Sequence, residues 1–407
     1  MTVVTEILKQ MVSITKPQEK LLSTLFATIL VVRGRVNFLN LSRYADYSER
    51  SLGRHFRKDF DFLDFNLRAI RKSVSTTATQ LLGQDTSFIP KSGKLTYGLD
   101  KFFDSCRGRA TKGLEVSLLS LIDLERHTAY TLSVKQTPPA LATQTQVESS
   151  GAEVATRVDF YLEHLRETRE CLPEAVQYGV FDGYYAKRKF IDGVCGLSLH
   201  AVSKLRHDAR LRYLYEGAQK KRGRPRRFDG KVSFDDLRRF ESGDCVDAGI
   251  QLYTAVVNSI SLQRDIRVVA VVNHKDQEKP RLALLFSTDT ELSATSIYRF
   301  YKARFQLEFL FRDAKQFTGL VDCQARDEKA LHFHFNVALS TVNLAKIEAQ
   351  RLNRCDEAMV FSLSSWKQRY FNEQFLEVII SKLELNQTAV KNHPQYEYLR
   401  SYGAIAA

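Results

Sequence analysis

One segment of the chain, residues 297–320, places ionisable side chains at helical spacing. On a helix turning about 100° per residue, Tyr301, Arg304, Glu308 and Lys315 fall in one stripe roughly 60° wide. An apolar stripe lies next to it, so Glu308 is expected at the border between core and surface. Desolvating an isolated carboxylate is costly, and a divalent metal ion would remove that cost. The alternative is a surface ion pair of Arg304 with Glu308, contributing about 0.3 kcal/mol.

Two aspartates in apolar runs provide the partners that such a site needs. Asp85 lies in the run 81–90, and Asp182 closes the run 176–182, so both are expected at strand ends. Phosphodiester cleavage with two metal ions needs carboxylates from several chain segments converging at one point. Oxygen ligands suit Mg²⁺, for which Mn²⁺ can substitute. The sequence therefore predicts that Asp85, Asp182 and Glu308 hold two Mg²⁺ ions and carry the chemistry.

Six other carboxylates compete for these places: Asp100, Asp104 and Asp123 with Asp85, Asp192 and Asp208 with Asp182, and Asp313 with Glu308. Asp313 would lie about 140° from Glu308 on a helical wheel, so one ion cannot bind both. Asp123 falls in an expected hairpin turn, where Asp is common because it forms local hydrogen bonds. Asp208 stands among arginines, which favours an ion pair. His332 and His334 are expected to be buried and hydrogen-bonded, with a metal pair as the alternative.

Residues 1–75 are expected to form helices that bind DNA. Asn40 or Ser42 is a candidate cap for a short helix over 41–45, and Ser48 for a second helix over 49–60. Two short helices around a tight turn, the second rich in arginine, fit a helix-turn-helix. Its DNA-binding residues would be Arg50, Arg54 and Arg57. An ordinary solvated basic face is the alternative.

The middle of the chain reads as a mixed α/β layout. Strands are expected at 81–90, 113–123, 127–134, 176–182 and 197–205, with a polar loop at 137–150 and helices at 152–170 and 184–194. Residues 206–290 are rich in β-type runs and predict an inserted β subdomain. Six of the eight residues 220–227 are basic, so Arg222, Arg224 and Arg226 are expected to contact DNA in a minor groove. A solvated loop is the alternative, and helices are expected after residue 318.

The overall charge also favours a polyanionic partner. There are 60 Lys and Arg against 47 Asp and Glu, which gives a net charge of +13. None of the six cysteines forms a C-x-x-C pair, which argues against a zinc ribbon and favours buried reduced thiols. The charged N-terminus does not resemble a signal peptide, and the uncharged run 21–32 is too short to span a bilayer. The expected location is the bacterial cytoplasm, associated with the nucleoid when bound to DNA, without membrane contact.

The pattern Tyr301-x₂-Arg304-x₃-Glu308-x₆-Lys315 resembles the Y-R-E-K signature of bacterial insertion-sequence DDE transposases of the insertion-sequence 4 family, and matches it at all four positions. Residues 82–113 and 178–187 are similar to the family's first and second catalytic segments, so the resemblance spans nearly the whole chain. It implies an RNase H-like core and Mg²⁺-dependent cleavage and strand transfer at transposon ends. Tyr301, Arg304 and Lys315 would then grip phosphates.

We therefore expect an α/β protein with an RNase H-like catalytic core interrupted by a β-rich insertion. The expected parts are a helical DNA-binding region over residues 1–75, the first part of the core over 76–205 and the insertion over 206–290. The second part of the core would follow over 291–345, and a helical tail over 346–407. The partners would be double-stranded DNA, as transposon ends and target, and a second copy in a homodimeric synaptic complex, for which the tail 371–385 is a candidate contact. The alternatives are an RNase H-like nuclease without strand transfer and a transposon-derived DNA-binding repressor.

Overall fold

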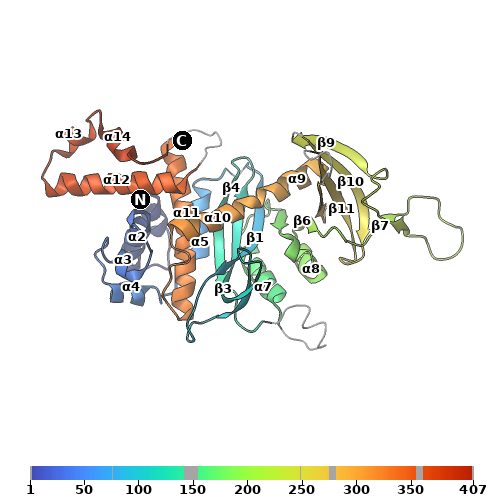
Figure 1. The fold of residues 1–407 in the computed structure, drawn as a ribbon, viewed down its shortest axis with the longest axis horizontal. Helices are drawn as coiled ribbons and strands as arrows, with labels where there is room; N and C mark the ends of the chain where they lie inside the picture. Colours follow the sequence, from blue (N-terminus) through green and yellow to red (C-terminus); the bar gives the residue numbers. More distant parts are fainter. Residues whose placement is uncertain are drawn as a thin grey trace.

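The structure, a computed structural model, describes residues 2–75, 77–141, 155–247, 249–274, 281–353 and 361–405. The loop expected at 137–150 and the start of the helix expected at 152–170 fall largely outside these ranges. A long sheet occupies the middle and one end of the molecule, and helices from both termini form the other end (Figure 1). No helix in these ranges is both long and apolar enough to cross a bilayer.

The N-terminal region is helical, as expected. Its helices are α1 (Thr2–Leu8), α2 (Lys16–Val31), α3 (Phe38–Leu41), α4 (Glu49–His55) and α5 (Phe62–Arg71). Ser48 caps α4 by accepting a hydrogen bond from the Ser51 N–H, as the sequence predicts. The helix expected over 41–45 is wrong, because Asn37 caps the earlier helix α3 and the chain turns after Leu41. Asn37, Asn40 and Ser42 are all of types that favour an N-cap, so the sequence alone does not fix where this helix begins.

The first half of the sheet carries the strands that the apolar runs predict, together with β2, which they do not predict. It contains β1 (Gln80–Ile89), β2 (Asp100–Asp104), β3 (Arg109–Asp123), β4 (Thr128–Gln136), β5 (Tyr178–Phe181) and β6 (His200–Leu205). Strands β4, β3 and β1 pair antiparallel, whereas β1, β5 and β6 pair parallel. The crossovers run through α7 (Arg157–Arg169) and, after a 3₁₀ turn η1 (Gly183–Tyr185), through α8 (Arg188–Gly196). From residue 113 to its end β3 is buried on both faces, as a central strand covered by helices should be.

The residues between β6 and α9 extend this same sheet. They form β7 (Leu211–Leu214), β8 (Phe228–Lys231), β9 (Glu241–Asp247), β10 (Ile250–Ser259), β11 (Arg264–Asn273) and β12 (Arg281–Ser287). Because β12 pairs antiparallel with β6, the described strands make one sheet of 12 strands. The basic segment 215–227 connects β7 to β8 and extends away from the body (Figure 1). We call it the basic arm.

The helices after the sheet are α9 (Ala294–Ala303), α10 (Phe305–Phe317), α11 (Glu328–Asn353), α12 (Leu363–Lys382), α13 (Gln387–Lys391) and α14 (Tyr396–Ser401). Ser293 caps α9 by accepting from the Ser296 N–H. The single helix expected over 297–320 is wrong, since it breaks at Arg304. There the Arg304 N–H bonds the Tyr301 carbonyl at 3.1 Å and the Leu307 N–H bonds the Arg304 carbonyl at 3.0 Å, a tighter 3₁₀ pattern.

Helix α11 closes the open edge of the sheet. Asn343 accepts from the Thr131 N–H and donates to the Thr131 carbonyl, each at 2.8 Å. Asn336 makes the same pair of bonds to Val134. These amides satisfy backbone groups of β4 that a further strand would otherwise pair with. The first half of the sheet is thereby fixed against α11.

Candidate active site

Strand pairing brings the two predicted aspartates together. The parallel pairing of β1 with β5 ends at Gln84 opposite Phe181. The next residue on each strand is Asp85 and Asp182, so the two lie side by side where β5 stops. Asp182 follows its strand as expected, but Asp85 lies inside β1, which continues to Ile89.

Close packing of α10 on β1 brings the third carboxylate, Glu308, towards the two aspartates. A Cβ on Gly83 would lie 2.8 Å from Leu307 Cδ1 and 3.0 Å from Ser120 Oγ, so the Leu307 side chain would have to shift to accept it. Gly83 and Asp85 point to the same face of the strand, because side chains alternate along it. Glu308, the residue after Leu307, is near enough to Asp85 for its negative charge to raise the pKa of Asp85. Gly83 is a functional position that the sequence analysis missed; its only signal is a glycine within an apolar run.

Arg304 joins two of the three carboxylates. Its Nη1 lies 3.1 Å from Asp85 Oδ2, and its Nη2 lies 2.8 Å from Glu308 Oε1. The side chains are 9% exposed for Arg304, 19% for Asp85 and 47% for Glu308. The expected ion pair of Arg304 with Glu308 is present, but Arg304 also contacts Asp85. Because Arg304 and Asp85 are largely buried, this is not a simple surface pair.

The electrostatics of Asp85 reflect this crowding. Burial raises the pKa of Asp85 to about 6, against the lowering effects of Arg304 and of the Thr86 N–H. The negative charges of Asp182 and Glu308 raise this pKa further. Burial lowers the pKa of Arg304, but Asp85, Tyr301 and Asp182 outweigh it and leave the pKa above its ordinary value. All three carboxylates therefore lie within one electrostatic neighbourhood that is short of positive charge.

The residues fit a hard divalent cation. Carboxylate oxygens are donors that Mg²⁺ prefers, and these three carboxylates come from different chain segments and influence one another electrostatically. Arg304 Nε and Tyr185 Oη are buried there without a hydrogen-bond partner among the described residues, so protein contacts alone leave this site incompletely satisfied. No three His, Cys, Asp or Glu side chains in the described ranges are already grouped around one point as ligands. The guanidinium group of Arg304 supplies the positive charge in this arrangement.

Tyr301 and Lys315 lie on opposite sides of this centre. Burial raises the pKa of Tyr301, whose hydroxyl also interacts with Arg304 and Asp182. Burial lowers the pKa of Lys315, while Asp104 and Cys106 raise it. Lys315 therefore faces the β2–β3 hairpin, two helical turns beyond Glu308.

The competing carboxylates all have other partners: Asp100 with Arg157, Asp104 with Arg107, Asp123 with the Arg126 N–H, Asp192 with Arg264, Asp208 with Arg206 and Asp313 with Arg312. The turn role expected for Asp123 and the ion pair expected for Asp208 are both present. None of the six contributes to the pKa of Asp85.

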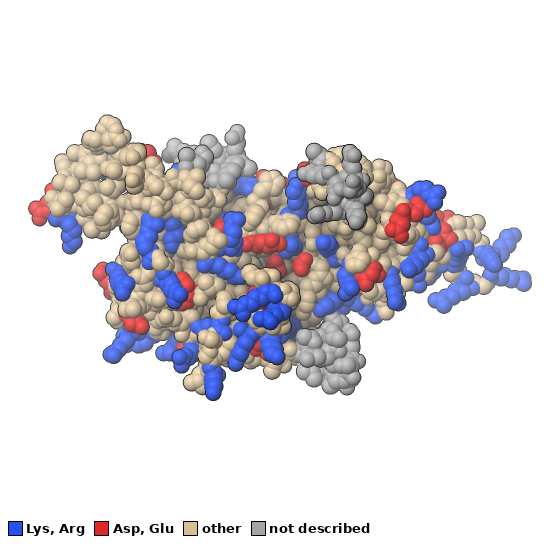
Figure 2. Space-filling view, viewed as in Figure 1, with Lys and Arg blue, Asp and Glu red and all other residues tan. Residues whose placement is uncertain are grey.

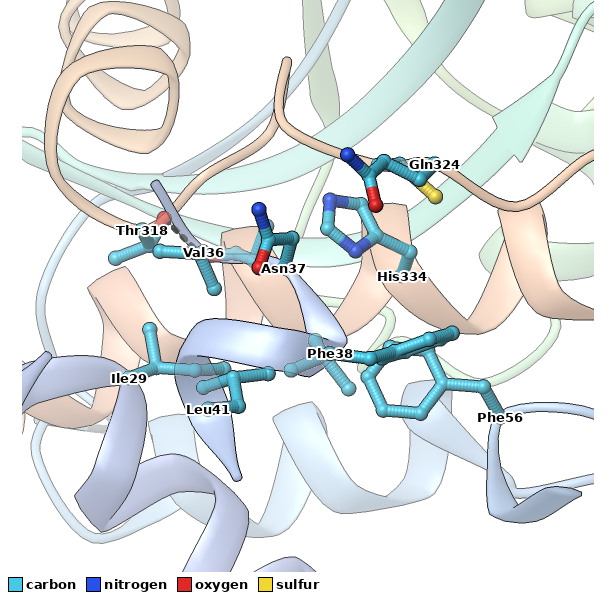
Figure 3. Close-up of a pocket in the computed structure, with 12 residues that line it drawn as sticks. Ile29, Val36, Asn37, Phe38, Leu41, Phe56, Thr318, Gln324 and His334 are labelled. Carbon is cyan, nitrogen blue, oxygen red and sulfur yellow. Dashed lines mark hydrogen bonds between the residues drawn. The ribbon is translucent and has the colours of Figure 1, made fainter. Parts of the chain in front are cut away.

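The two histidines do not form a metal pair. His334 is buried, as expected, and its Nε2 lies 2.8 Å from the Gly319 carbonyl, whereas His332 is exposed. His334 lines a pocket between α2, α3 and α11 with Asn37, Thr318 and Gln324 among mainly apolar side chains (Figure 3). This pocket contains no carboxylate and is separate from the candidate active site.

The expectation of buried cysteines is wrong. Of the five in the described ranges only Cys323 is buried, and Cys106, Cys171 and Cys245 are exposed. All five are free thiols.

The predicted DNA-binding arginines lie far apart on the surface. Arg50, Arg54 and Arg57 are exposed on or just after α4, and Arg57 pairs with Asp327 at 3.1 Å. Arg222 and Arg224 are exposed on the basic arm, where Arg226 pairs with Asp229 at 2.6 Å. Basic side chains cover much of one face and the tip of the arm (Figure 2). The structure does not gather these residues at the carboxylates.

The large mixed sheet with its covering helices is consistent with a nuclease core of the DDE kind, and comparison with protein families agrees. A family described as DDE superfamily endonuclease matches residues 13–244, and one described as Transposase DDE domain matches residues 156–344. The first match covers more than half of the chain, which therefore belongs to the DDE superfamily endonucleases. Together the matches include all three carboxylates and indicate a nuclease-type enzyme with a transposase-type function. No curated protein matches the chain.

Proposed function

We propose that this protein is a DDE transposase of the insertion-sequence 4 kind, which cuts DNA at transposon ends and transfers the strands to target DNA. Asp85, Asp182 and Glu308 are its catalytic residues. The observation that carries this proposal is their convergence around Arg304 from β1, the end of β5 and α10. The strand order β4-β3-β1-β5-β6, three antiparallel strands followed by two parallel ones, supports an RNase H-like core.

The three carboxylates would hold two Mg²⁺ ions, which supply activation of the attacking oxygen and stabilisation of the leaving oxygen. Arg304 keeps the carboxylates together when no other cation is present. Its planar fork is suited to a phosphate once those carboxylates have another cation to neutralise them. Tyr301 and Lys315 contact phosphates on either side of the scissile bond. The attack is made first by water and then by a DNA 3′-hydroxyl.

The decisive experiment is metal-dependent nicking of a labelled DNA end. Wild type should nick with Mg²⁺ or Mn²⁺ and not in EDTA, and Glu308→Gln should lose at least about 100-fold in rate. Glu291→Gln removes an exposed carboxylate just before α9 and should nick like wild type. Equal nicking by Glu308→Gln and wild type would refute the proposed catalytic role, as would undiminished nicking in EDTA.

Strand transfer separates a transposase from a nuclease of the same fold. Incubating the cut, 3′-labelled end with supercoiled plasmid should give plasmid that carries the label. Nicking without any capture would instead identify an RNase H-like nuclease, and DNA binding without nicking would identify a repressor.

The exposed arginines of α4 and of the basic arm are proposed to bind duplex DNA. An arm with a Gly-Arg-Pro centre can follow a minor groove and contact phosphates. Neutralising Arg222 and Arg224 together should weaken duplex binding at every sequence and reduce the slope of log K against log salt by about 2. Titrations at several salt concentrations measure this slope, and an unchanged slope would show that the arm does not touch phosphates.

The division of the chain at residues 75, 205, 290 and 345 is part of this proposal, as is a homodimer in the synaptic complex. Helix α12 and the residues that follow it expose a series of apolar side chains: Phe375, Val378, Leu383 and Leu385. Such side chains are suited to contact with a second copy.

A further inference from the structure

The β2–β3 hairpin carries an unusual arrangement of charge on its outer face. Lys101 on β2 and Lys112 on β3 are direct cross-strand partners, and both are exposed. Like charges directly opposite each other destabilise an antiparallel pair. Within the described ranges no acidic side chain pairs with either ammonium group. The hairpin thus retains a repulsive pair that its own fold does not need.

An aromatic ring lies on the same face. Phe103 is two residues after Lys101, so the two side chains point the same way. Its residue exposure is 62%, and its cross-strand partner Ala110 is too small to cover it. Arg107 in the turn of the hairpin is exposed as well. The acidic groups of the hairpin are already paired, Asp104 with Arg107 and Asp100 with Arg157.

The hairpin is also directly connected to the candidate active site. It is the continuation of β3, whose Leu118 pairs with Asp85. Lys112 lies six residues further along, about 20 Å at strand spacing. Lys315 of α10 approaches the hairpin at Asp104 and Cys106. A DNA strand leaving the carboxylates would reach Lys112 within roughly six nucleotides at 3.4 Å each. Basic side chains gather over this part of the molecule in Figure 2.

We propose that the outer face of the β2–β3 hairpin binds single-stranded DNA that flanks the cut in the transposon end. Lys101 and Lys112 contact successive phosphates, and Phe103 stacks on an unpaired base between them. Cations that follow a backbone beside an exposed aromatic ring are the common design of single-strand binding surfaces. A continuous duplex would offer Phe103 no base face. This inference rests on the proposed function, because it takes the DNA end as the substrate.

The test is DNA binding in EDTA, so that it does not depend on cleavage. Two DNA ends are compared by fluorescence anisotropy, one blunt and one with six unpaired nucleotides at the cut position. Wild type should bind the end with unpaired nucleotides more tightly. Lys101→Gln with Lys112→Gln should weaken that binding about tenfold and lower its salt slope by about 1.4, with little change for the blunt end.

Phe103→Ala should remove the preference for unpaired nucleotides, and Phe103→Tyr should retain it. The matched control is Lys9→Gln with Lys20→Gln, which removes the same charge from two exposed lysines outside the hairpin. The melting temperature of the Lys101 and Lys112 variant should equal or exceed that of wild type, because a like-charge pair has been removed.

An unchanged salt slope would overturn the proposal. Equal weakening on both DNA ends would also overturn it, since the hairpin would then bind duplex. If wild type bound neither DNA end, the proposed function itself would fail, which is a separate result.

Discussion

Asp85→Asn should abolish Mg²⁺-dependent nicking and at the same time stabilise the metal-free protein. The loss of rate should be at least about 100-fold, because one carboxylate of the site is gone. The stabilisation follows from the pKa of Asp85, which burial raises from its ordinary value of 3.8 to about 6 in the folded protein. Ionising this carboxyl group therefore costs more free energy in the folded protein than in the unfolded chain, even with Arg304 beside it.

The sign of the pH dependence follows from proton binding. Between about pH 4 and 6 the folded state holds the Asp85 proton more tightly than the unfolded chain does, so this group's contribution to stability falls as pH rises. Above pH 6 the contribution stays constant and amounts to a destabilisation of up to about 3 kcal/mol. Asparagine lacks this titration, so the stability advantage of the variant should grow from pH 4 to 6 and then level off.

Urea denaturation in EDTA across this pH range measures the effect. Addition of Mg²⁺ should stabilise wild type and narrow the difference, since a bound cation favours the ionised carboxylate. A variant that is less stable than wild type at pH 8 would show that the ion pair with Arg304 outweighs the burial of Asp85.

Arg304→Gln should destabilise the metal-free protein by about 3 kcal/mol or more at pH 8. It removes the cation that bridges Asp85 and Glu308 and leaves Asp85 buried next to two like charges. The pKa of Asp85 should then rise further, because the lowering effect of Arg304 is lost. The variant should recover stability as pH falls and Asp85 takes up a proton, and also when Mg²⁺ is added.

Two comparisons separate this mechanism from a general loss of packing. Arg299→Gln removes an exposed arginine of α9 and should change stability by less than about 0.5 kcal/mol. Arg304→Gln combined with Asp85→Asn should regain much of the lost stability, because no buried charge is left uncompensated. Failure of both the double variant and low pH to restore stability would show that Arg304 acts mainly through its packing.

Two of the three candidate carboxylates lie in local sequence contexts with clear periodicity. Asp182 closes a short apolar strand, and Glu308 occupies the border of an amphipathic helix; both contexts are local. Asp85 lies inside β1, as it does within the expected strand 81–90, so the expectation that it stands at a strand end is wrong. The strand ends are set by pairing between segments distant in sequence.

The break in the helix at Arg304 could not be predicted from the sequence either. Its neighbours are ordinary helix formers, and no Gly or Pro marks the site. We attribute the break to tertiary contacts, because Arg304 reaches Asp85 on β1 as well as Glu308 on its own helix. Likewise, β-type runs in residues 206–290 predicted strands, but not that β12 would pair with β6.

That pairing of β12 with β6 has a geometric consequence. The strand before the basic arm, β7, belongs to the same sheet as the strands that carry Asp85 and precede Asp182. A sheet held by continuous backbone hydrogen bonds resists bending, so the base of the basic arm keeps a set angle and separation from the carboxylates that we propose as catalytic. The sheet would then fix the number of base pairs between the stretch of duplex bound by the basic arm and the bond that is cut.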